Sequence, residues 1–532
     1  MTFDEIIARL KEAKGDPEQL ALATVDVTLA GQDKRLREAL EAAAIPHWFD
    51  ERILAHLLDA DPAESAVLRE RLVALPMVES FAARKGWNVH EATRLALRRK
   101  LQSSRPDRFL ELSAKASAYW EEAGDDVVFQ IEALYHSLIS QPEAGADRLE
   151  RTYWKWDFAG RFEATQALGT ALDELTGVPL ADSARGRVLF VLGWIRLARI
   201  PLKQSEQSTR EAVTLLEATG SEASYADARS LLGRILEREG RPKEALAEYQ
   251  SCKRIMESLT ERDPANTDWQ RNLFGSHTFV GRVYQAQGTL EEALGEYHSS
   301  KRIMESLTVE SDPANLDWQK DLSTAHSDVG NVYDAQGKLN EALAEYQSSK
   351  RIMESLTARD RANTDWQWDL SVSHQCVGHV NQAQGKLEEA LVEYRSRKRI
   401  MESLTALDAA NTDWQHDLSV SHNNLGSVYQ AQGKLEEALG EYQSGKRIME
   451  SLTVLDPTNT NWQSDLSVSH NRLGSVYQAL GAAGEARAEF EAGLAIVDRL
   501  VVHDPTNAGW QEDLEYIRNL IANLPKTKGA AG

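Results

Sequence analysis

Few residues in this chain stand in patterns that could do chemistry, and none of these patterns is complete. The segment from His90 to Arg94 begins like the helix of a zinc protease, but Arg94 occupies the place of the required second histidine. The chain has neither a Gly-x-Ser-x-Gly nucleophile turn nor a Gly-x-x-x-x-Gly-Lys-Ser/Thr phosphate loop. Cys252 and Cys376 have no sequence neighbour that would activate a thiol. We therefore expect no catalytic residue, no cofactor and no metal, with a cryptic hydrolase assembled by folding as one alternative.

Five histidines recur at nearly constant spacing, each four residues before a glycine. A row of metal sites is conceivable, but successive histidines are one whole repeat apart, so we interpret them as packing residues. They are His277, His326, His374, His422 and His470.

The histidines belong to an internal repeat. The string Lys-Arg-Ile-Met-Glu-Ser-Leu-Thr occurs five times, at intervals of 48, 49, 48 and 48 residues, starting at Lys253, Lys301, Lys350, Lys398 and Lys446. The extra residue falls between Thr308 and Asp312, where we expect a loop. Each unit predicts two helices of about twenty residues, the first beginning with a Thr-x-x-Gln capping box such as Thr412 with Gln415. Lysines of the string, such as Lys398 with Glu402, are expected to form i,i+4 pairs on a solvated face.

Gly426, Tyr429, Ala438 and Tyr442 stand at the offsets of the tetratricopeptide repeat, and most other copies match them. The chain resembles that family, although its period is 48 rather than about 34 residues and Asn381 replaces one tyrosine. The resemblance implies an all-α fold, a right-handed α-solenoid over residues 221–524 that ends in a capping helix. A glycine inside a helix costs about 1 kcal/mol, and we expect close approach of the second helix at Ala438 to offset this cost.

Residues 45–108 predict two short helices, a small hairpin around Arg84-Lys85-Gly86 and a longer helix from His90. This segment resembles the winged helix of STAND-class signalling ATPases, and Ile131 to Leu138 resembles the helical arm that follows it there. The resemblance covers residues 45–140 and lacks the ATPase domain. His90 stands where that family can sense nucleotide, but we interpret it as structural. The expected domains are an N-terminal helical segment (1–44), a winged-helix-like domain (45–108), a divergent helical arm (109–220), the solenoid (221–524) and a flexible tail (525–532).

Three aromatic residues of the arm, Trp154, Phe158 and Phe162, are spaced to lie on one helix face, which predicts a buried stripe. Trp156 points elsewhere on such a helix, and we expect it to be exposed.

The charge of the chain argues against nucleic acid as a partner. The sequence has 82 acidic and 60 basic side chains, a net charge of -22, which repels phosphate backbones. The densest basic cluster is nevertheless a possible nucleic-acid patch, and a winged-helix transcription regulator with a repeat-based input domain is a second alternative. The patch comprises Arg94, Arg98, Arg99, Lys100 and Arg105.

No run of 18 apolar residues is present, so we expect no membrane span. The N-terminus does not read as a secretory leader, and two cysteines are too few for a disulfide framework, which favours the cytoplasm.

Recognition of another protein is the function that the repeats predict. The copies are so alike that their differences are informative, and many differences fall on the first helix, at positions that line the inner groove in the family it resembles. Amide and hydroxyl side chains there could pair with a peptide backbone. We expect a non-catalytic adaptor or regulatory subunit that holds a protein or peptide, such as an effector encoded nearby, in bacterial signalling or phage defence. The expected groove residues are Asn331, Gln382, Asn423, Ser427, Gln430, Asn471, Ser475 and Gln478.

Overall fold

The computed structural model describes residues 15–197 and 202–525, which are helical apart from one small hairpin and the connecting turns. The chain divides into two compact units, Met1–Pro264 and Ala265–Gly532. The division follows helix α14 (Pro242–Arg262), one helix pair beyond residue 221. The expected domain limits stay predictions, and the tail after Pro525 lies outside the described residues.

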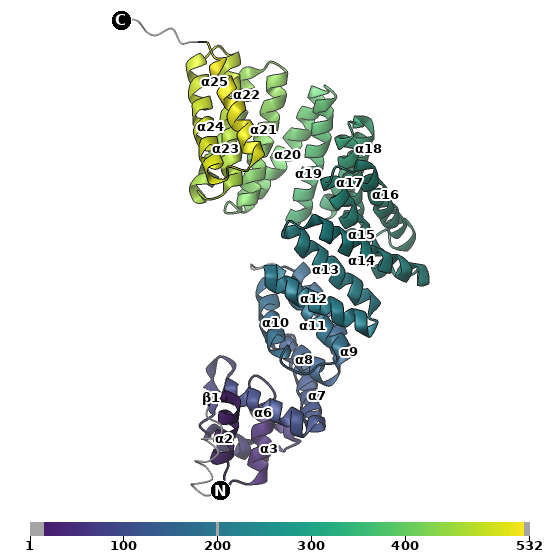
Figure 1. The fold of residues 1–532 in the computed structure, drawn as a ribbon, viewed down its shortest axis with the longest axis vertical. Coiled ribbons are helices and arrows are strands. Elements are labelled where there is room, and N and C mark those ends of the chain that lie inside the picture. Colours follow the sequence, from purple (N-terminus) through teal and green to yellow (C-terminus); the bar gives the residue numbers. More distant parts are fainter. Residues whose placement is uncertain (1–14, 198–201, 526–532) are drawn as a thin grey trace, which may run out of the picture. The chain divides into compact units, whose positions relative to one another are not determined.

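In the first unit, residues 45–108 form the elements that the sequence predicts, in the predicted order (Figure 1). Helices α4 and α5 precede two antiparallel strands, β1 and β2, in which Val78 pairs with Val89, and α6 follows. The attribution to winged helices stays a prediction. The first part of this unit comprises α2 (Pro17–Thr28), α3 (Lys34–Ala43), α4 (Glu51–Leu58), α5 (Pro62–Val73), β1 (Val78–Phe81), the 3-10 turn η1 (Ala82–Arg84), β2 (Gly86–Val89) and α6 (Glu91–Ser104).

The rest of the first unit is a run of helices in which each contacts its neighbours in the chain. Many of its apolar side chains join one continuous core from Val25 to Ile235. The helices are α7 (Pro106–Ala123), α8 (Val127–Ser140), α9 (Pro142–Phe158), α10 (Phe162–Leu175), α11 (Asp182–Leu197), α12 (Leu202–Thr219), α13 (Glu222–Arg238) and α14.

A break between α9 and α10 overturns the prediction of one buried aromatic stripe. Gly160 adopts a left-handed conformation (φ 64), so α9 ends at Phe158 and a new helix begins at Phe162. Phe162 is therefore 73% exposed, whereas Trp156, which we expected to be exposed, is buried at 1%. Trp154 is half-buried, and the side chain of Phe158 lies outside the described residues.

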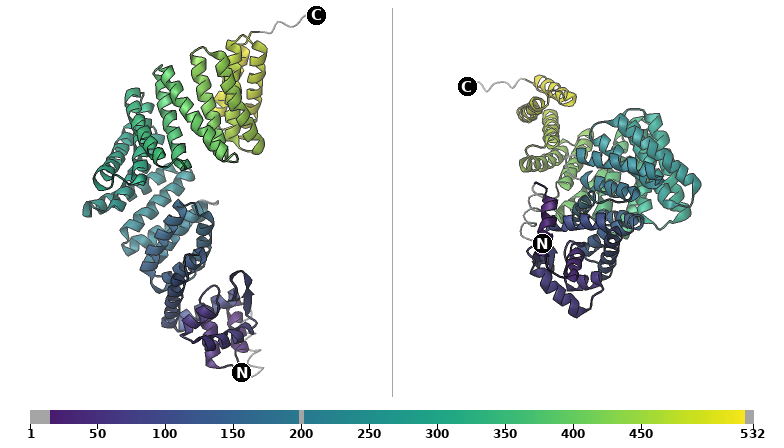
Figure 2. Two further views of the ribbon diagram at one scale, coloured as in Figure 1. Left: turned by 180° about the vertical axis from the view of Figure 1, so that it is seen from behind. Right: turned by 60° about the horizontal axis from the view of Figure 1, so that its bottom comes forward.

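The second unit stacks five helix pairs and a final single helix, and each helix packs against the next one in the chain (Figures 1 and 2). We call the first helix of each pair helix A and the second helix B. The A helices are α15 (Thr267–Ala286), α17 (Leu316–Ala335), α19 (Thr364–Ala383), α21 (Thr412–Ala431) and α23 (Thr460–Ala479). The B helices are α16 (Leu290–Ser306), α18 (Leu339–Arg359), α20 (Leu387–Leu407), α22 (Leu435–Leu455) and α24 (Ala483–His503), followed by α25 (Ala508–Ala522).

An asparagine, not the predicted threonine, caps every helix A. Asn411 accepts a hydrogen bond from the Trp414 backbone N–H at 3.0 Å, and Thr412 is already the first helical residue. The Gln415 side chain donates to the backbone oxygen of Ala409, at 2.5 Å, instead of completing a capping box. Asn266, Asn315, Asn363, Asn459 and Asn507 cap their helices in the same way.

The glycine in the middle of helix A makes room for an aromatic ring of helix B. A Cβ atom on Gly426 would lie 2.6 Å from the ring of Tyr442, well inside contact distance. Ala438 packs elsewhere, in a cluster with Leu473 and Val476 of the next repeat. Helix B therefore approaches helix A closely, as expected, but it does so at Tyr442 and not at Ala438.

The extra residue between Thr308 and Asp312 lies in a helical turn, not in the expected loop. It forms a π-helical turn, η2 (Leu307–Ser311), at the end of α16, because the Asp312 N–H bonds to the oxygen of Leu307, five residues back. In the next repeat the equivalent bond, from Asp360 to Leu356, spans four residues.

Candidate binding surface

The recurring histidines of helix A contact helix B within the same repeat. His422 Nδ1 lies 2.5 Å from Glu441 Oε2, and Lys398 of the preceding helix B donates to the same carboxylate at 3.1 Å. Glu402, the partner predicted for Lys398, is more distant, at 3.9 Å. The same His–Glu–Lys group recurs as His326–Glu345–Lys301, His374–Glu393–Lys350 and His470–Glu489–Lys446.

The four glutamates of these groups are ionised more readily than ordinary carboxyls. Burial raises the pKa of Glu441, but the hydrogen bond with His422 and the ion pair with Lys398 outweigh it and lower the pKa below its usual value. The group thus joins two consecutive repeats through one shared carboxylate. Within residues 15–197 and 202–525, no cluster of three or more His, Cys, Asp or Glu side chains could hold a metal ion.

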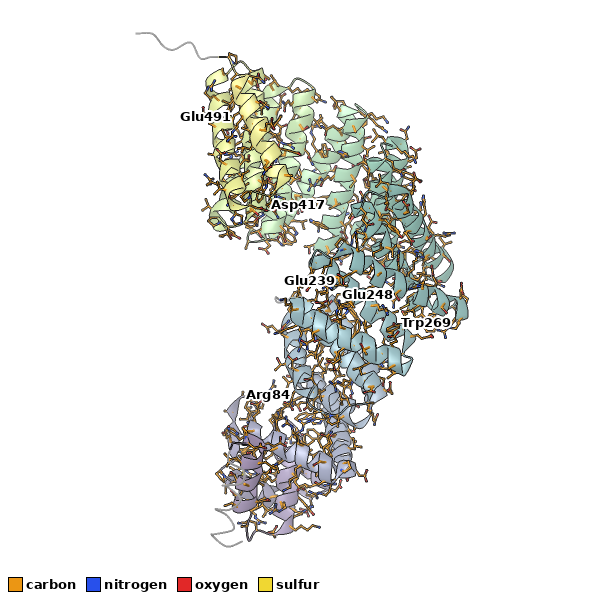
Figure 3. All side chains as sticks on the ribbon, in the orientation of Figure 1. Arg84, Glu239, Glu248, Trp269, Asp417 and Glu491 are labelled. Carbon is orange, nitrogen blue, oxygen red and sulfur yellow. The ribbon has the colours of Figure 1, made fainter. Side chains whose placement is uncertain are left out.

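Consecutive A helices contact one another directly. Trp368 Nε1 donates to Asp417 Oδ2 of the next helix A at 2.7 Å; Asp417 is labelled in Figure 3. The aspartate recurs in the four later A helices while its donor changes, as in Arg271–Asp321, Lys320–Asp369 and His416–Asp465. These bonds place the A helices side by side, so their exposed sides form one continuous surface.

Two of the expected groove residues, Gln382 and Gln430, bind tyrosines of helix B. Gln430 Oε1 accepts a hydrogen bond from the Tyr442 hydroxyl at 3.1 Å, and Gln382 accepts one from Tyr394 at 3.1 Å. Because the same tyrosine ring fills the space beside the helix glycine, these amides support the packing inside a repeat.

Asn423 and Asn471 lie between the two helices of their repeats. Their Oδ1 atoms are buried and have no hydrogen-bond partner, and a Cβ atom on Gly445 or Gly493 would lie 3.1 or 2.8 Å from them. In an earlier repeat the equivalent pair is Ser327 with Ser349, joined by a hydrogen bond of 2.9 Å. This position therefore varies together with the helix B residue that it faces.

The other four expected residues are more accessible. Asn331 is exposed and accepts a hydrogen bond from the Tyr346 hydroxyl at 2.7 Å, and Gln478 is exposed. Ser427 accepts a bond from Gln382 Nε2 at 3.0 Å, and Ser475 donates to a backbone oxygen of its own helix at 2.9 Å. The structure thus places all eight on A helices, but only part of the set faces solvent.

A different set of positions carries the variation between repeats. Four positions in each helix A, spaced i, i+4, i+8 and i+11, lie on one side of the helix. The first and third differ in all five copies, whereas the second is valine in three copies and the fourth is serine in two. We call this surface the helix-A face. It consists of Arg271, Gly275, Phe279 and Arg282; Lys320, Thr324, Asp328 and Asn331; Trp368, Val372, Cys376 and His379; His416, Val420, Asn424 and Ser427; Ser464, Val468, Arg472 and Ser475.

Most side chains of the helix-A face are half-buried or exposed, and their chemistry is mixed. Trp368 is 39% exposed, and His379 has a side chain 60% exposed whose Nδ1 lies 3.3 Å from Asp334. Burial raises the pKa of Asp328 to about 7 and that of the Cys376 thiol to about 11. A thiol with such a pKa is a poor nucleophile, so the face suits contact with a ligand better than covalent chemistry.

The cations of the expected nucleic-acid patch are all paired with carboxylates. Arg94 and Arg98 are buried, each only 4% exposed, and both bind Glu174. Arg99 pairs with Glu18 at 2.5 Å, Lys100 with Asp26 at 3.8 Å, and Arg105 with Glu41.

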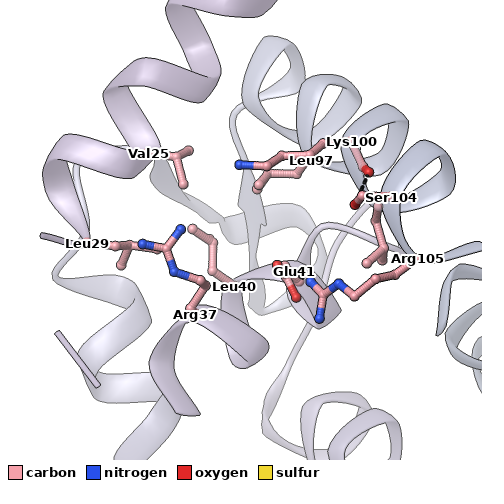
Figure 4. A pocket seen from close by; sticks show the side chains of 10 residues that line it. Val25, Leu29, Arg37, Leu40, Glu41, Leu97, Lys100, Ser104 and Arg105 are labelled. Carbon is pink, nitrogen blue, oxygen red and sulfur yellow. Dashed lines mark hydrogen bonds and ion pairs between the residues drawn. The ribbon is translucent and has the colours of Figure 1, made fainter. Parts of the chain in front are cut away.

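Figure 4 shows Lys100 of α6 and Arg105, which follows this helix, beside Arg37 and Glu41 of α3, around a pocket of about 30 Å³. Such a pocket is too small for a nucleotide. The nucleic-acid patch stays a prediction, but ion pairs within the unit neutralise its charges, and Arg94 and Arg98 are buried.

The buried arginines belong to a polar network that joins α6 to α8 and α10. Glu174 accepts two hydrogen bonds from Arg94, at 3.1 and 2.6 Å, one from Arg98 at 3.0 Å and one from the Tyr135 hydroxyl at 2.5 Å. His47 bridges Glu174, at 3.2 Å, and Glu132 on α8, at 2.8 Å.

In this network the pKa of Glu174 and that of His136 are both lowered, for different reasons. Burial raises the pKa of Glu174, but its bonds with His47 and Arg94 outweigh that effect and hold it well below the usual range. Burial lowers the pKa of His136 to about 4, so this histidine is neutral at physiological pH. The network therefore stays ionised around a neutral histidine and ties residues 45–108 to the helices that follow.

The half zinc-protease pattern forms no site. His90 is exposed and precedes α6, where its backbone N–H bonds to Met77 at 2.8 Å, while Arg94 is held by Glu174. Cys252 and Cys376 are free thiols. Across the described residues, no helix is long and apolar enough to cross a membrane.

The comparisons with known proteins agree with this architecture. The sequence profile described as tetratricopeptide repeat matches residues 226–251. Among solved structures, a STAND protein with a tetratricopeptide repeat sensor from Pyrococcus horikoshii is similar over 98% of this chain and 72% of its own, with 11% identity and a TM-score of 0.53. The quorum sensor NprR from B. thuringiensis is similar over 75% of this chain and 96% of its own, with 13% identity and a TM-score of 0.46.

BtubC from P. vanneervenii is similar over 55% of this chain and 96% of its own, with 17% identity and a TM-score of 0.36. Comparison with curated protein sequences gives no match. The repeats, their packing and the matched profile define the class: this chain is a tetratricopeptide-repeat protein with an all-α, solenoid-type fold.

Proposed function

We propose that this chain is a non-catalytic adaptor or regulatory subunit that binds a partner protein or peptide along its helix-A face. One observation supports this most: residues that fold the repeat are copied almost unchanged, whereas the residues of the helix-A face, most of them half-buried or exposed, vary more between copies. Folding alone would not demand different side chains there, since every copy has the same neighbours. A partner that touches each repeat at a different point would demand them.

The chemistry of the face suits a segment of protein. Trp368 and Val372 offer apolar contact, while Ser427, Ser475 and His379 offer hydrogen bonds to backbone N–H and C=O groups. An extended segment or a helix of the partner could meet several A helices at once, because the A helices lie side by side.

The setting that we propose is regulation of an effector in bacterial signalling or phage defence, in the cytoplasm. The similarity to the Pyrococcus STAND protein, which has a tetratricopeptide repeat sensor, supports a sensing role. The transcription-regulator alternative loses its main support, because the cations proposed for DNA are paired with carboxylates.

Site-specific photo-cross-linking tests this proposal. A photoreactive residue at Ser427 or His379, on the helix-A face, should link the partner in cell extract, and the same residue at the exposed Glu437 of α22 should not. With the identified partner, Trp368→Ala combined with His379→Ala should weaken binding at least about ten-fold, and Glu437→Ala should leave it unchanged. Equal cross-linking from the helix-A face and from Glu437, or substrate turnover by the purified chain, would contradict the proposal.

A further inference from the structure

The π-helical turn η2 borders a pocket in the second unit. The pocket has a volume of about 500 Å³ and lies between the end of helix α16 with its π turn, the first half of α17, and α18. Single π turns inside α-helices are frequent at functional sites. We call this cavity between α16, α17 and α18 the π-turn pocket. Its polar lining residues are Thr308, Gln319, His326, Ser348, Arg351 and Ser355.

Among the described side chains, the lining of the π-turn pocket contains a guanidinium group and three hydroxyls but no carboxylate. Arg351 is exposed, and it donates to the Ser348 hydroxyl at 3.0 Å. In the described part of the chain, no carboxylate lies within ion-pair distance of Arg351. Its remaining N–H groups are therefore available to a ligand.

Two carboxylates of the neighbouring shared-carboxylate groups are occupied by other cations. Glu345 binds His326 at 2.6 Å and Lys301 at 2.7 Å, and the neighbouring Lys350 binds Glu393 at 2.7 Å. Arg351 thus forms no ion pair with the described residues, and Ser355 beside it has a hydroxyl that can turn toward a ligand.

A second pocket of the same kind in the first unit provides an internal comparison. It has a volume of about 530 Å³ and contains the same sequence of side chains from helix B, namely Ser251, Arg254, Ile255 and Ser258. Its lining also includes Glu217 and Glu222, whose charges oppose an anion. Among the described side chains of these two pockets, only those of the π-turn pocket combine the arginine with a lining free of acids.

We propose that the π-turn pocket binds a phosphate monoester, with Arg351 as the anchoring cation. The guanidinium group presents several N–H donors in a fixed plane, which matches phosphate oxygens, and charge-assisted bonds of this kind are the strong ones. The hydroxyl of Ser355 can add a further donor. None of the lining residues belongs to the helix-A face, so this site is separate from the proposed partner surface.

Calorimetric titration of the full chain with inorganic phosphate, at constant ionic strength, tests the site. The wild-type chain should show saturable binding, which Arg351→Gln should weaken at least about ten-fold. Arg399→Gln is the matched control, because Arg399 is the equivalent exposed residue of the next repeat. This variant, and Arg254→Gln in the first unit, should bind phosphate as the wild type does, and circular dichroism should give all variants the same melting curve.

Three outcomes would overturn the proposal: no saturable binding by the wild type, equal loss in Arg351→Gln and Arg399→Gln, or acetate bound as tightly as phosphate. Two further ligands identify the source of the phosphate. Tighter binding of a phosphoserine peptide than of glycerol phosphate would assign the site to a phosphorylated protein, and the reverse order would assign it to a small metabolite.

Discussion

At the residue scale, the contact between a glycine and a tyrosine sets the distance between the two helices of each repeat. A Cβ atom on Gly281, Gly330, Gly378 or Gly426 would lie 2.6 to 2.9 Å from the tyrosine of the following helix B. The tyrosine hydroxyl is in turn held by helix A, as in the bond from Tyr442 to Gln430. Glycine is therefore needed despite its low helix propensity.

Replacement of Gly426 by alanine tests this interpretation. Alanine should stabilise an isolated helix by about 1 kcal/mol, but here its methyl group collides with the Tyr442 ring, at a typical cost of about 1–3 kcal/mol. We expect Gly426→Ala to lower the urea midpoint. The matched control is Gly440→Ala in α22, where a Cβ atom meets nothing within 4 Å, and which should raise the midpoint or leave it unchanged. A stabilised Gly426→Ala variant would show that the ring moves aside freely.

At the element scale, shared carboxylates hold successive repeats together. Glu441 binds His422 of its own helix pair and Lys398 of the preceding helix B, and three other glutamates repeat the arrangement. Each carboxylate is largely buried, so loss of its charge would leave both partners with weaker contacts.

The lowered pKa of Glu441 predicts how stability changes with pH. A carboxyl whose pKa is lower in the folded chain stabilises it above the unfolded pKa, near 4.5, and this stabilisation is lost as the pH falls through the folded pKa. At pH 7, Glu441→Gln should reduce the free energy of unfolding by about 1–3 kcal/mol. In urea titrations between pH 7 and pH 3, the difference from the wild type should shrink below about pH 4.5.

Glu437→Gln serves as the control for this experiment, because Glu437 is exposed on the same helix. It should match the wild type at every pH. A constant difference between Glu441→Gln and the wild type down to pH 3 would mean that the ionised form of Glu441 is not what stabilises the repeat.

At the scale of the whole molecule, the chain is divided into two compact units that are stabilised by different means. The first unit has one extended apolar core and a buried ionic network around Glu174. The second has a series of smaller apolar clusters that join helix B of one repeat to helix A of the next, together with repeated ion pairs. Damage to the network should therefore remain within the first unit.

Hydrogen exchange measured by mass spectrometry tests this separation. Glu174→Gln would leave Arg94 and Arg98 buried without a full countercharge, a change that typically costs about 3–5 kcal/mol. We expect faster exchange in α6, α8 and α10, with no change in α17 to α24. Glu163→Gln, at an exposed position of α10, should change neither unit. Faster exchange throughout the second unit would show that the two units unfold together.

Much of the second unit was predictable because a repeat supplies the same evidence several times. The spacing of the glycines and tyrosines predicted the helix pairs, and the spaced histidines were recognised as packing residues. The partners across repeats were not predictable in the same way. Lys398 has a glutamate four residues away in sequence, yet it binds Glu441, which lies 43 residues further along the chain.

The candidate site was predicted less well than the fold. The sequence placed the variable positions on helix A, but it did not separate those that face helix B, such as Asn423, from those that face solvent, such as Ser427. A comparison of both helices would have shown that the two facing positions change together, with Asn423 opposite Gly445 and Ser327 opposite Ser349. In the arm, the predicted aromatic stripe overlooked Gly160, whose left-handed conformation breaks the helix.

The amino-acid pattern alone determined that helices form, where they pair and which side of each is apolar, because these properties depend on neighbours within a few residues. Only the tertiary structure decided which charges are neutralised, which polar side chains stay accessible and which residues line each pocket. Those properties depend on how neighbouring helices are rotated and spaced, and residues 40 or more positions apart in the chain set that geometry. Arg94 and Arg351 illustrate the difference, since burial pairs one with Glu174 and exposure leaves the other available to bind an anion.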